Sequence, residues 1–189
     1  RFRELLTEAV HLRLHGDVEV GTYLSGGIDS AAVAAIAARF AGHRMKAFTI
    51  GFSDPAYDET RYAEALARHA GLEHHVLRLG PQALAEQFQE SLWHTELPVM
   101  NAHGAAKYML SELAGRYVKV VLTGEGADEL LMGYAQFRHH ELLDRLACDP
   151  SDRAARQTLQ QFLGTEGIQF GVTTARHYEQ YDRVMEKFG

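Results

Sequence analysis

A strand that ends in two adjacent glycines and leads directly into a helix constrains this chain more than any other feature. The apolar and β-branched residues of 18–24 predict the strand, the sequence SGGIDS follows at 25–30, and the small residues of 31–41 predict the helix. Adjacent glycines allow a tight turn in which several N–H groups face one point, and the helix adds its own free N–H groups. This arrangement predicts a binding site for an anion such as phosphate.

Asp29 is unusual in such a loop, because a carboxylate repels phosphate unless Mg²⁺ lies between them. A plain turn followed by an ordinary helix start is the alternative interpretation, and the loop alone does not decide between the two. The chain contains neither G-x-x-x-x-G-K-[ST] nor G-x-G-x-x-G. Positive charge for a phosphate would therefore come from a metal ion or from Lys and Arg elsewhere.

Composition excludes several classes of protein. The 189 residues suit one domain, and a hydrophobic content of 46% is enough for a real core. With 19 Lys and Arg against 25 Asp and Glu, the net charge of −6 argues against a protein that holds nucleic acid by a basic face. The single Cys148 excludes an internal disulfide and fits a reducing compartment, so we expect a cytoplasmic protein. No apolar run approaches the length of a membrane span.

Predicted strands and helices alternate up to about residue 134, which indicates crossover connections and a parallel sheet. We therefore expect an α/β fold, with a twisted parallel sheet covered by helices on both faces and a helical C-terminal part. The predicted strands are Val18–Leu24, Met45–Phe52, His75–Leu79 and Val118–Thr123. The predicted helices are Phe2–His15, Ala31–Ala41, Tyr57–Ala70, Pro81–Trp93, Ala102–Arg116, Phe137–Ala147, Ser151–Phe162 and Thr174–Phe188.

A second glycine-containing turn, TGEGADE at residues 123–129, follows the last predicted strand. Its carboxylates, Glu125, Asp128 and Glu129, repel one another unless they are solvated or face a cation. The alternative is that Asp128 and Glu129 simply complement the dipole at a helix start. Ligands bind beyond the carboxyl ends of parallel strands, so this turn and the SGGIDS loop are expected at one rim. Asp29 and Asp128 could then share one Mg²⁺.

These motifs together resemble the synthetase domain of the glutamine-dependent asparagine synthetases. SGGIDS is similar to the pyrophosphate loop of the N-type ATP pyrophosphatases, and LTGEGADEL followed by Gly133-Tyr134 narrows the resemblance. FTIGF at residues 48–52, Tyr57-Asp58-Glu59 and GLEHH at residues 71–75 also resemble that family. The resemblance covers residues 1 to about 140 in the right order. It implies an adenine nucleotide alpha hydrolase-like fold.

The resemblance implies an ATP-dependent ligase of the asparagine synthase (glutamine-hydrolysing) type. ATP and Mg²⁺ would activate a carboxylate, with aspartate the first candidate, as an acyl-adenylate; ammonia from a glutaminase domain would then give the amide and AMP. Glu125 would be the catalytic residue near the attack of the amine, and Asp29 and Asp128 would bind the metal. The residues expected to bind the nucleotide are Leu24, Ser25, Gly26, Gly27, Asp29, Ser30, Ile50, Thr123 and Gly124.

Other interpretations stay open. A related amidotransferase or a β-lactam or macrolactam synthetase-like cyclase would use the same adenylation on another acid, and a non-catalytic nucleotide-binding domain could keep the fold. The family's glutaminase half, its Arg-x-Pro-Phe-Leu-Asp stretch and its later glycine-lysine segment are not in this sequence. Lys107 could contact phosphate, although a solvated lysine on a helix is the more ordinary role.

The chain is expected to be one domain over residues 1–189, with residues 140–189 as a helical extension. It begins at Arg1 inside a predicted helix, so we expect a piece of a longer protein that is truncated at both ends. The expected partners are small molecules, with no nucleic acid and no membrane, and a homodimer is compatible with the resemblance.

Overall fold

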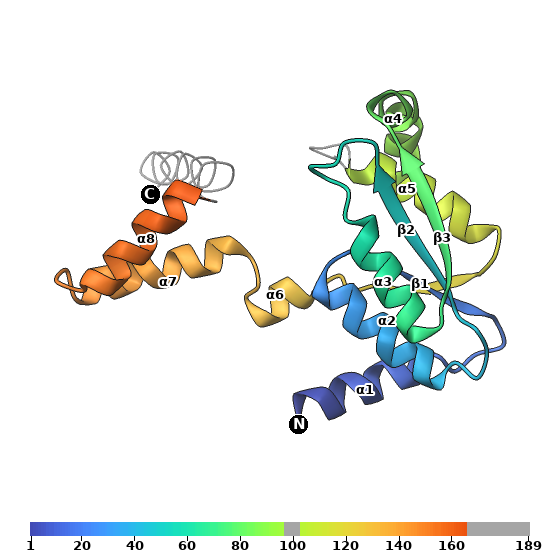
Figure 1. Ribbon diagram of the computed structural model, residues 1–189, viewed down its shortest axis with the longest axis horizontal. Helices are drawn as coiled ribbons and strands as arrows, with labels where there is room; N and C mark the ends of the chain where they lie inside the picture. Colours follow the sequence, from blue (N-terminus) through green and yellow to red (C-terminus); the bar gives the residue numbers. More distant parts are fainter. Residues whose placement is uncertain (97–102, 166–189) are drawn as a thin grey trace. The chain divides into compact units, whose positions relative to one another are not determined.

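The computed structural model describes residues 1–96 and 103–165, and its contacts divide the chain into two compact units, 1–125 and 126–189. The first unit contains a four-stranded parallel sheet in the order β3-β2-β1-β4 (Figure 1). The strands are β1 Val20–Tyr23, β2 Lys46–Phe52, β3 Glu73–Leu79 and β4 Val120–Leu122. The predicted parallel sheet is confirmed.

Helices pack on both faces of this sheet, as expected for strands joined by crossovers. On one face α1, α2 and α3 form a layer in which α2 contacts both of the others; on the other face α5 packs against β2 and β3 and is contacted by α4 (Figure 1). The helices of this unit are α1 Phe2–Leu12, α2 Ile28–Phe40, α3 Thr60–Ala70, α4 Pro81–Thr95 and α5 His103–Gly115.

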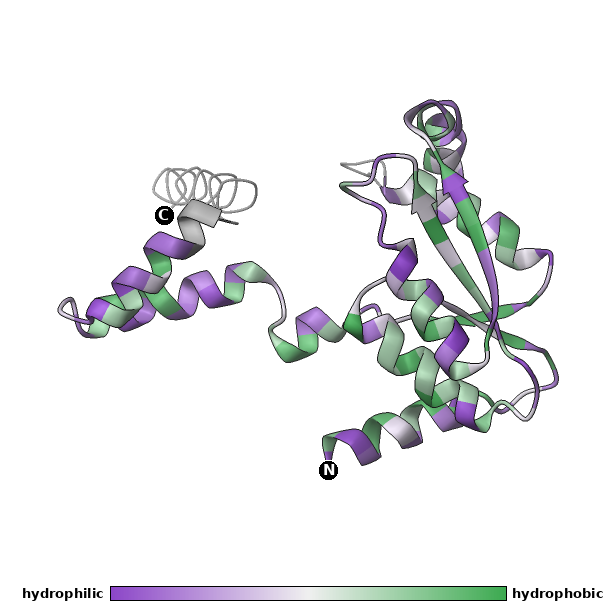
Figure 2. Cartoon of the chain, in the orientation of Figure 1, coloured by the Kyte–Doolittle hydropathy of each residue, from purple (hydrophilic) through white to green (hydrophobic). Residues whose placement is uncertain are grey.

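Each face of the sheet has its own apolar cluster, because successive side chains of a strand point to opposite faces. In β2, Ala47 belongs to the cluster under α1–α3, whereas its neighbour Phe48 belongs to the cluster under α5. Alanines of α2 and α3 at 0–2% exposure let these helices approach the sheet closely. Figure 2 shows α2 coloured pale to green along most of its length, which agrees with a helix made largely of apolar residues.

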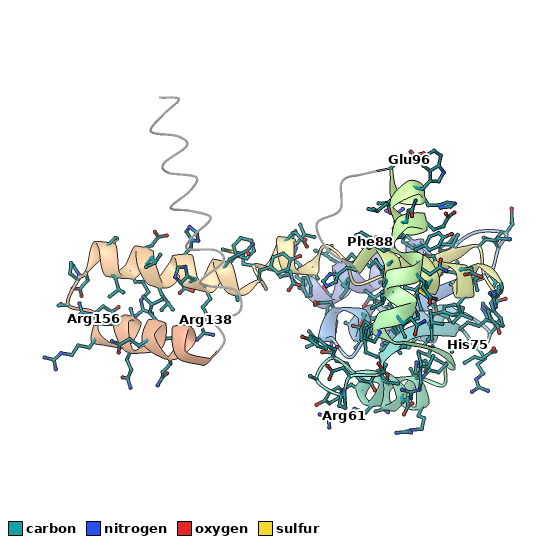
Figure 3. All side chains as sticks on the ribbon, turned by 90° about the horizontal axis from the view of Figure 1, so that it is seen from above. Arg61, His75, Phe88, Glu96, Arg138 and Arg156 are labelled. Atoms are coloured by element: carbon teal, nitrogen blue, oxygen red, sulfur yellow. The ribbon has the colours of Figure 1, made fainter. Side chains whose placement is uncertain are left out.

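The second unit is helical in its described part, as predicted for the region after the sheet. Its helices are α6 Ala127–Leu131, α7 Ala135–Cys148 and α8 Arg153–Thr165. α7 and α8 pack on each other around the buried Leu142 and Ala155, and an Arg145–Asp152 ion pair of 2.7 Å closes the turn between them. Side chains such as Arg138 and Arg156 project from these two helices in Figure 3.

Several predicted boundaries shift by a few residues. α2 begins at Ile28 rather than Ala31, because the Gly27 carbonyl accepts the N–H of Ala31 and closes the first turn. α3 begins at Thr60 rather than Tyr57, because Asp58 accepts both the N–H and the hydroxyl of Thr60 and holds the preceding residues in a loop. The predicted helix Thr174–Phe188 lies outside the described residues. None of the helices described here is long and apolar enough to cross a membrane.

Candidate functional site

The SGGIDS loop between β1 and α2 is held by its own serines. The Ser30 hydroxyl donates to the Gly27 carbonyl at 3.1 Å and accepts the Ser25 N–H at 3.1 Å. Because a hydroxyl has one proton, the 2.8 Å contact between the two hydroxyls is donated by Ser25, which in turn accepts the Gly27 N–H at 3.0 Å. Ser30, only 9% exposed, therefore shapes the loop from inside.

Backbone N–H groups are the donors that this loop can offer to an anion. Gly27 is the N-cap of α2 and gives no side-chain cap, and the N–H groups of Ile28 and Asp29 lie in the first turn, where a helix has no internal acceptor. The positive end of the α2 dipole adds to them. Ser25, Gly27 and Ile28 are exposed, so this end of α2 is open to solvent. The loop can therefore accommodate a phosphate group.

Gly124 brings the second motif against this loop. A Cβ on Gly124 would lie 2.5 Å from the Ser30 nitrogen and 2.8 Å from the Asp29 carbonyl carbon. Real Cβ atoms do not approach backbone that closely, so only glycine fits without a shift of the helix start. The two motifs that the sequence predicted at one rim are in contact.

The topology gives this meeting point a special place in the sheet. β1 and β4 pair in parallel, with Thr22 opposite Leu122, so their carboxyl ends lie side by side. The chain runs outward from β1 through β2 to β3 and then returns to add β4 on the other side of β1. In open α/β sheets, ligands bind in the crevice where the direction of winding changes in this way.

A third segment reaches the same loop from the carboxyl end of β2. A Cβ on Gly26 would meet the Glu59 Cβ at 2.6 Å and the Glu59 carbonyl at 3.2 Å. The adjacent Asp58 has its pKa lowered, mainly by the hydroxyl and N–H of Thr60 and also by Arg78, whose guanidinium lies 3.7 Å away. Tyr57-Asp58-Glu59 is part of the family resemblance, but no role was predicted for it. The sequence feature that could have indicated its place beside the loop is its position after the second predicted strand.

Glu125, the predicted catalytic residue, is paired with a lysine. Its Oε1 lies 2.5 Å from Nζ of Lys107, and the side chains are 67% and 55% exposed respectively. Lys107 is in the first half of α5, whereas Glu125 follows β4. From the sequence, Lys107 is expected either to contact phosphate or to be a solvated lysine. Its ion pair with Glu125 was not predicted.

The residues expected around the adenosine differ in what they can present. Leu24 is 2% exposed and packs under α1–α3, so its side chain belongs to the core and only its backbone could meet a ligand. Ile50 is partly buried in the cluster on the opposite face. Thr123 is exposed beside Gly124. A role for any of these residues in nucleotide binding stays a prediction.

A polar network centred on the buried Thr49 joins β2 to β3 and to Leu24, the residue that follows β1. Thr49 Oγ1 donates to the Leu24 carbonyl at 2.6 Å and lies 2.7 Å from Nε2 of His74. Since the hydroxyl proton goes to Leu24, Nε2 of His74 carries the hydrogen and donates to Thr49. Burial lowers the pKa of His74 below its ordinary value of 6.5, against an opposing effect of Glu64. Sequence reasoning missed this network.

Asp128, the second predicted metal ligand, lies in the second unit. Its carboxylate contacts the backbone of Gly133, where a Cβ would meet the Oδ1 atom, and its carbonyl accepts the Gly133 N–H at 3.0 Å. The neighbouring Glu129 accepts the Tyr134 hydroxyl at 2.6 Å, which lowers the pKa of Glu129. Among residues 1–96 and 103–165, no three His, Cys, Asp or Glu side chains are grouped to hold a metal ion. Joint metal binding by Asp29 and Asp128 stays a prediction.

Among curated proteins, the chain is similar both to proteins named amidases and to proteins named asparagine synthetases. Amidase chyE of Penicillium rubens is 38% identical over 72% of this chain, and asparagine synthetase [glutamine-hydrolyzing] 1 of Bacillus subtilis is 32% identical over 72% of it. The chain covers only 22% and 21% of the lengths of those proteins. Among solved structures, the NH3-dependent NAD synthetase of Campylobacter jejuni matches with a TM-score of 0.49 and 20% identity, over 70% of this chain and 59% of that one.

The sequence model of the family described as asparagine synthase matches residues 1–188, which is nearly the whole chain. The resemblance drawn from SGGIDS and TGEGADE is thereby confirmed. The parallel sheet with helices on both faces agrees with the α/β class expected from the sequence. This chain belongs to the asparagine synthase family.

Proposed function

We propose that this chain is the nucleotide-binding part of a ligase that adenylates a carboxylate, aspartate first among the candidates, and then forms the amide from ammonia. One observation carries the proposal: the contact of Gly124 with the first turn of α2, at the carboxyl ends of β1 and β4. Membership of the asparagine synthase family supports it. The chain matches only part of its relatives, so the activity, the glutaminase domain that would supply ammonia, a homodimer and a cytoplasmic location are all part of the proposal.

The proposed roles follow from the chemistry of the donors. The N–H groups of Gly26, Ile28 and Asp29 would hold the phosphates that leave as pyrophosphate, and backbone donors already in place stabilise charge as it develops. Mg²⁺ would neutralise that charge; Asp29 and Asp128 are its proposed ligands, and Mg²⁺ needs only one or two carboxylates when phosphates and water complete its shell. Glu125 would take a proton from the attacking amine.

A calorimetric titration with ATP in the presence and absence of Mg²⁺ tests the site. We expect Mg²⁺-dependent binding to the natural protein and a loss of about tenfold or more in Asp29→Asn, since a neutral amide removes the charge that the metal requires. Asp17→Asn, an exposed aspartate just before the predicted first strand, is the matched control and should bind as the natural protein does. Equal binding by both variants would contradict the metal role of Asp29.

The reaction itself is tested by exchange of labelled pyrophosphate into ATP in the presence of single carboxylic acids. Exchange that depends on aspartate supports an asparagine-forming ligase. Exchange that depends on a different acid supports the second candidate, a related amidotransferase or cyclase; two relatives at 38% and 34% identity carry the name amidase rather than asparagine synthetase. Binding of MgATP without exchange for any acid would indicate the third alternative, a non-catalytic nucleotide-binding domain.

A further inference from the structure

Lys107 and Glu125 meet although they lie on separate elements of the first unit. The 2.5 Å contact joins the first half of α5 to the residue that follows Gly124. Both side chains are more than half exposed, and an exposed ion pair adds little to the stability of a fold. Fold stability therefore does not account for this contact. Its position at the end of β4, next to the predicted site, suggests a role in function instead.

The backbone that carries Lys107 is fixed by its surroundings. Ala105, Ala106 and Leu110 are 0–5% exposed and anchor α5 to the body of the unit. One turn after Lys107, Ser111 donates to the Lys107 carbonyl at 2.7 Å and its hydroxyl lies 2.7 Å from that of Tyr23, the last residue of β1. The helix turn that carries the lysine is thus tied to the strand that leads into the SGGIDS loop.

Glu125 has no comparable support of its own. It follows the strand in a turn between two glycines, and its side chain is 67% exposed. A glutamate in that setting samples many rotamers, and holding one of them costs conformational entropy. A proton acceptor acts only when it is held within hydrogen-bond reach of the proton that it takes. The ammonium group of Lys107, carried by an anchored turn of α5, supplies a charged partner that narrows the positions of the Glu125 carboxylate.

We propose that Lys107 is a positioning residue that holds the carboxylate of Glu125 in place for the amide-forming step, an inference that rests on the proposed function. Lys107 acts through Glu125 and does not itself contact the reacting atoms. It follows that the two residues are needed for the same step and for no other. The formation of the acyl-adenylate, which uses the phosphate loop, does not need the pair.

The test compares two steps in the protein at its natural length. Acid-dependent exchange of pyrophosphate into ATP measures adenylation, and formation of amide from added ammonia measures the second step. We expect Lys107→Met to keep the exchange rate and the KM for ATP while the kcat of amide formation falls about tenfold or more, because misplacement of a reacting group by about 1 Å costs up to roughly a hundredfold. Lys107→Arg, which keeps the positive charge, should restore most of the rate.

A double variant separates positioning from a structural effect. If Lys107 acts through Glu125, Lys107→Met should lower the amide rate in the natural background but not in the Glu125→Gln background, since coupled residues are not additive. Lys119→Met, an exposed lysine just before β4, is the matched control and should leave both steps unchanged.

Each other outcome overturns a defined statement. Unchanged amide formation in Lys107→Met, or equal losses in both backgrounds, overturns the positioning role and leaves the proposed function standing. If Lys107→Met loses both pyrophosphate exchange and amide formation, the positioning role is overturned in favour of a direct contact between Lys107 and phosphate. Absence of exchange with every acid in the natural protein overturns the proposed function itself and the role of the pair with it.

Discussion

At the scale of single residues, Gly124 shows how a glycine can be required by close approach rather than by an unusual backbone angle. A Cβ at this position would lie 2.5 Å from the Ser30 nitrogen and 2.8 Å from the Asp29 carbonyl carbon. These are backbone atoms in the first turn of α2, which cannot move aside as the tip of a flexible side chain can. The position of the phosphate loop and the absence of a side chain at residue 124 therefore depend on each other.

Gly124→Ala should consequently lower both stability and nucleotide binding. We expect a loss of about 1–3 kcal/mol in the free energy of unfolding, the usual cost of forcing a methyl group into a packed site. Urea unfolding followed by circular dichroism measures it, and calorimetry measures the weaker binding of MgATP. Gly115→Ala is the control, because a Cβ at Gly115 would meet nothing within 4 Å. Equal stability of the two variants would show that α2 can move without cost.

His74 makes a prediction about pH. Burial lowers its pKa below 6.5, so the unfolded chain binds a proton more readily than the folded chain in the range just below that pH. The contribution to stability is complete above about pH 6.5 and is lost as the pH falls toward the lower pKa of the folded state. The free energy of unfolding, measured by urea titration between about pH 7 and pH 5, should fall.

Two variants assign this pH dependence. His74→Gln should flatten the profile between about pH 7 and pH 5, because glutamine does not titrate there. His69→Gln, at an exposed position in α3, should keep the slope of the natural protein. A profile that is the same in natural protein and His74→Gln would rule out His74 as the source of the slope.

The site residues that could be predicted were those that lie close together in short sequence motifs. Ser25–Ser30 and Thr123–Glu125 each combine a strand end, glycine and polar side chains, so their place at the rim followed from the alternation of elements. The contacts of Lys107 with Glu125 and of Thr49 with His74 join residues far apart in sequence. Only the three-dimensional arrangement of the sheet and α5 decides which of many polar residues meet.

At the scale of elements, β2 is the strand that ties the sheet together. It pairs with β1 on one side and along its whole length with β3 on the other. Thr49 adds side-chain hydrogen bonds in both directions, to the Leu24 carbonyl after β1 and to His74 of β3. In the neighbouring register pair of the same two strands, Phe48 stacks on His75 with ring centroids 5.4 Å apart; His75 is labelled in Figure 3.

Thr49→Val should weaken this connection while it keeps the shape of the side chain. The Leu24 carbonyl and the Nε2 hydrogen of His74 would both lose a partner, and an unpaired buried polar group costs about 1–3 kcal/mol. Urea unfolding checks the value. Thr7→Val is the control, since the hydroxyl of Thr7 makes only an exposed bond to the Arg3 carbonyl and its loss should change stability by less than about 0.5 kcal/mol. A loss no larger in Thr49→Val than in Thr7→Val would contradict the role assigned to the network.

Apart from the short α6, the types and the order of the described elements were predicted, whereas their ends were not. Periodic apolar residues predicted each of the described strands, but side-chain hydrogen bonds set several boundaries, as Asp58 does at the start of α3. β4 is only three residues long although six were predicted, because Val118 turns into the core with α5 and Thr123 is exposed. Such choices depend on tertiary contacts that a linear pattern does not contain.

At the scale of the whole molecule, the chain separates at the acidic turn that follows β4. Both apolar clusters, whose buried members run from Val10 to Val118, lie in the first unit, and the boundary falls between Glu125 and Gly126. Gly126, with φ of +91°, begins α6 in a conformation that favours glycine. The motif that the sequence treats as one acidic turn is thus divided between two compact units, with Glu125 in one and Asp128 in the other.

A protein that ends at Glu125 tests what this division means. We expect residues 1–125 to fold with a cooperative urea transition, because the whole sheet, both apolar clusters and the Lys107–Glu125 pair lie within that range. The sequence-based expectation of one domain over residues 1–189 leads to the opposite result, an uncooperative transition and loss of near-ultraviolet circular dichroism.

If the shorter protein folds but binds MgATP more weakly than the 189-residue chain, the difference should be reproduced by Asp128→Asn in the longer chain, since Asp128 is the proposed metal ligand that truncation removes. A shorter protein that binds MgATP as tightly as the longer one would instead place the whole metal site on the Asp29 side of the boundary.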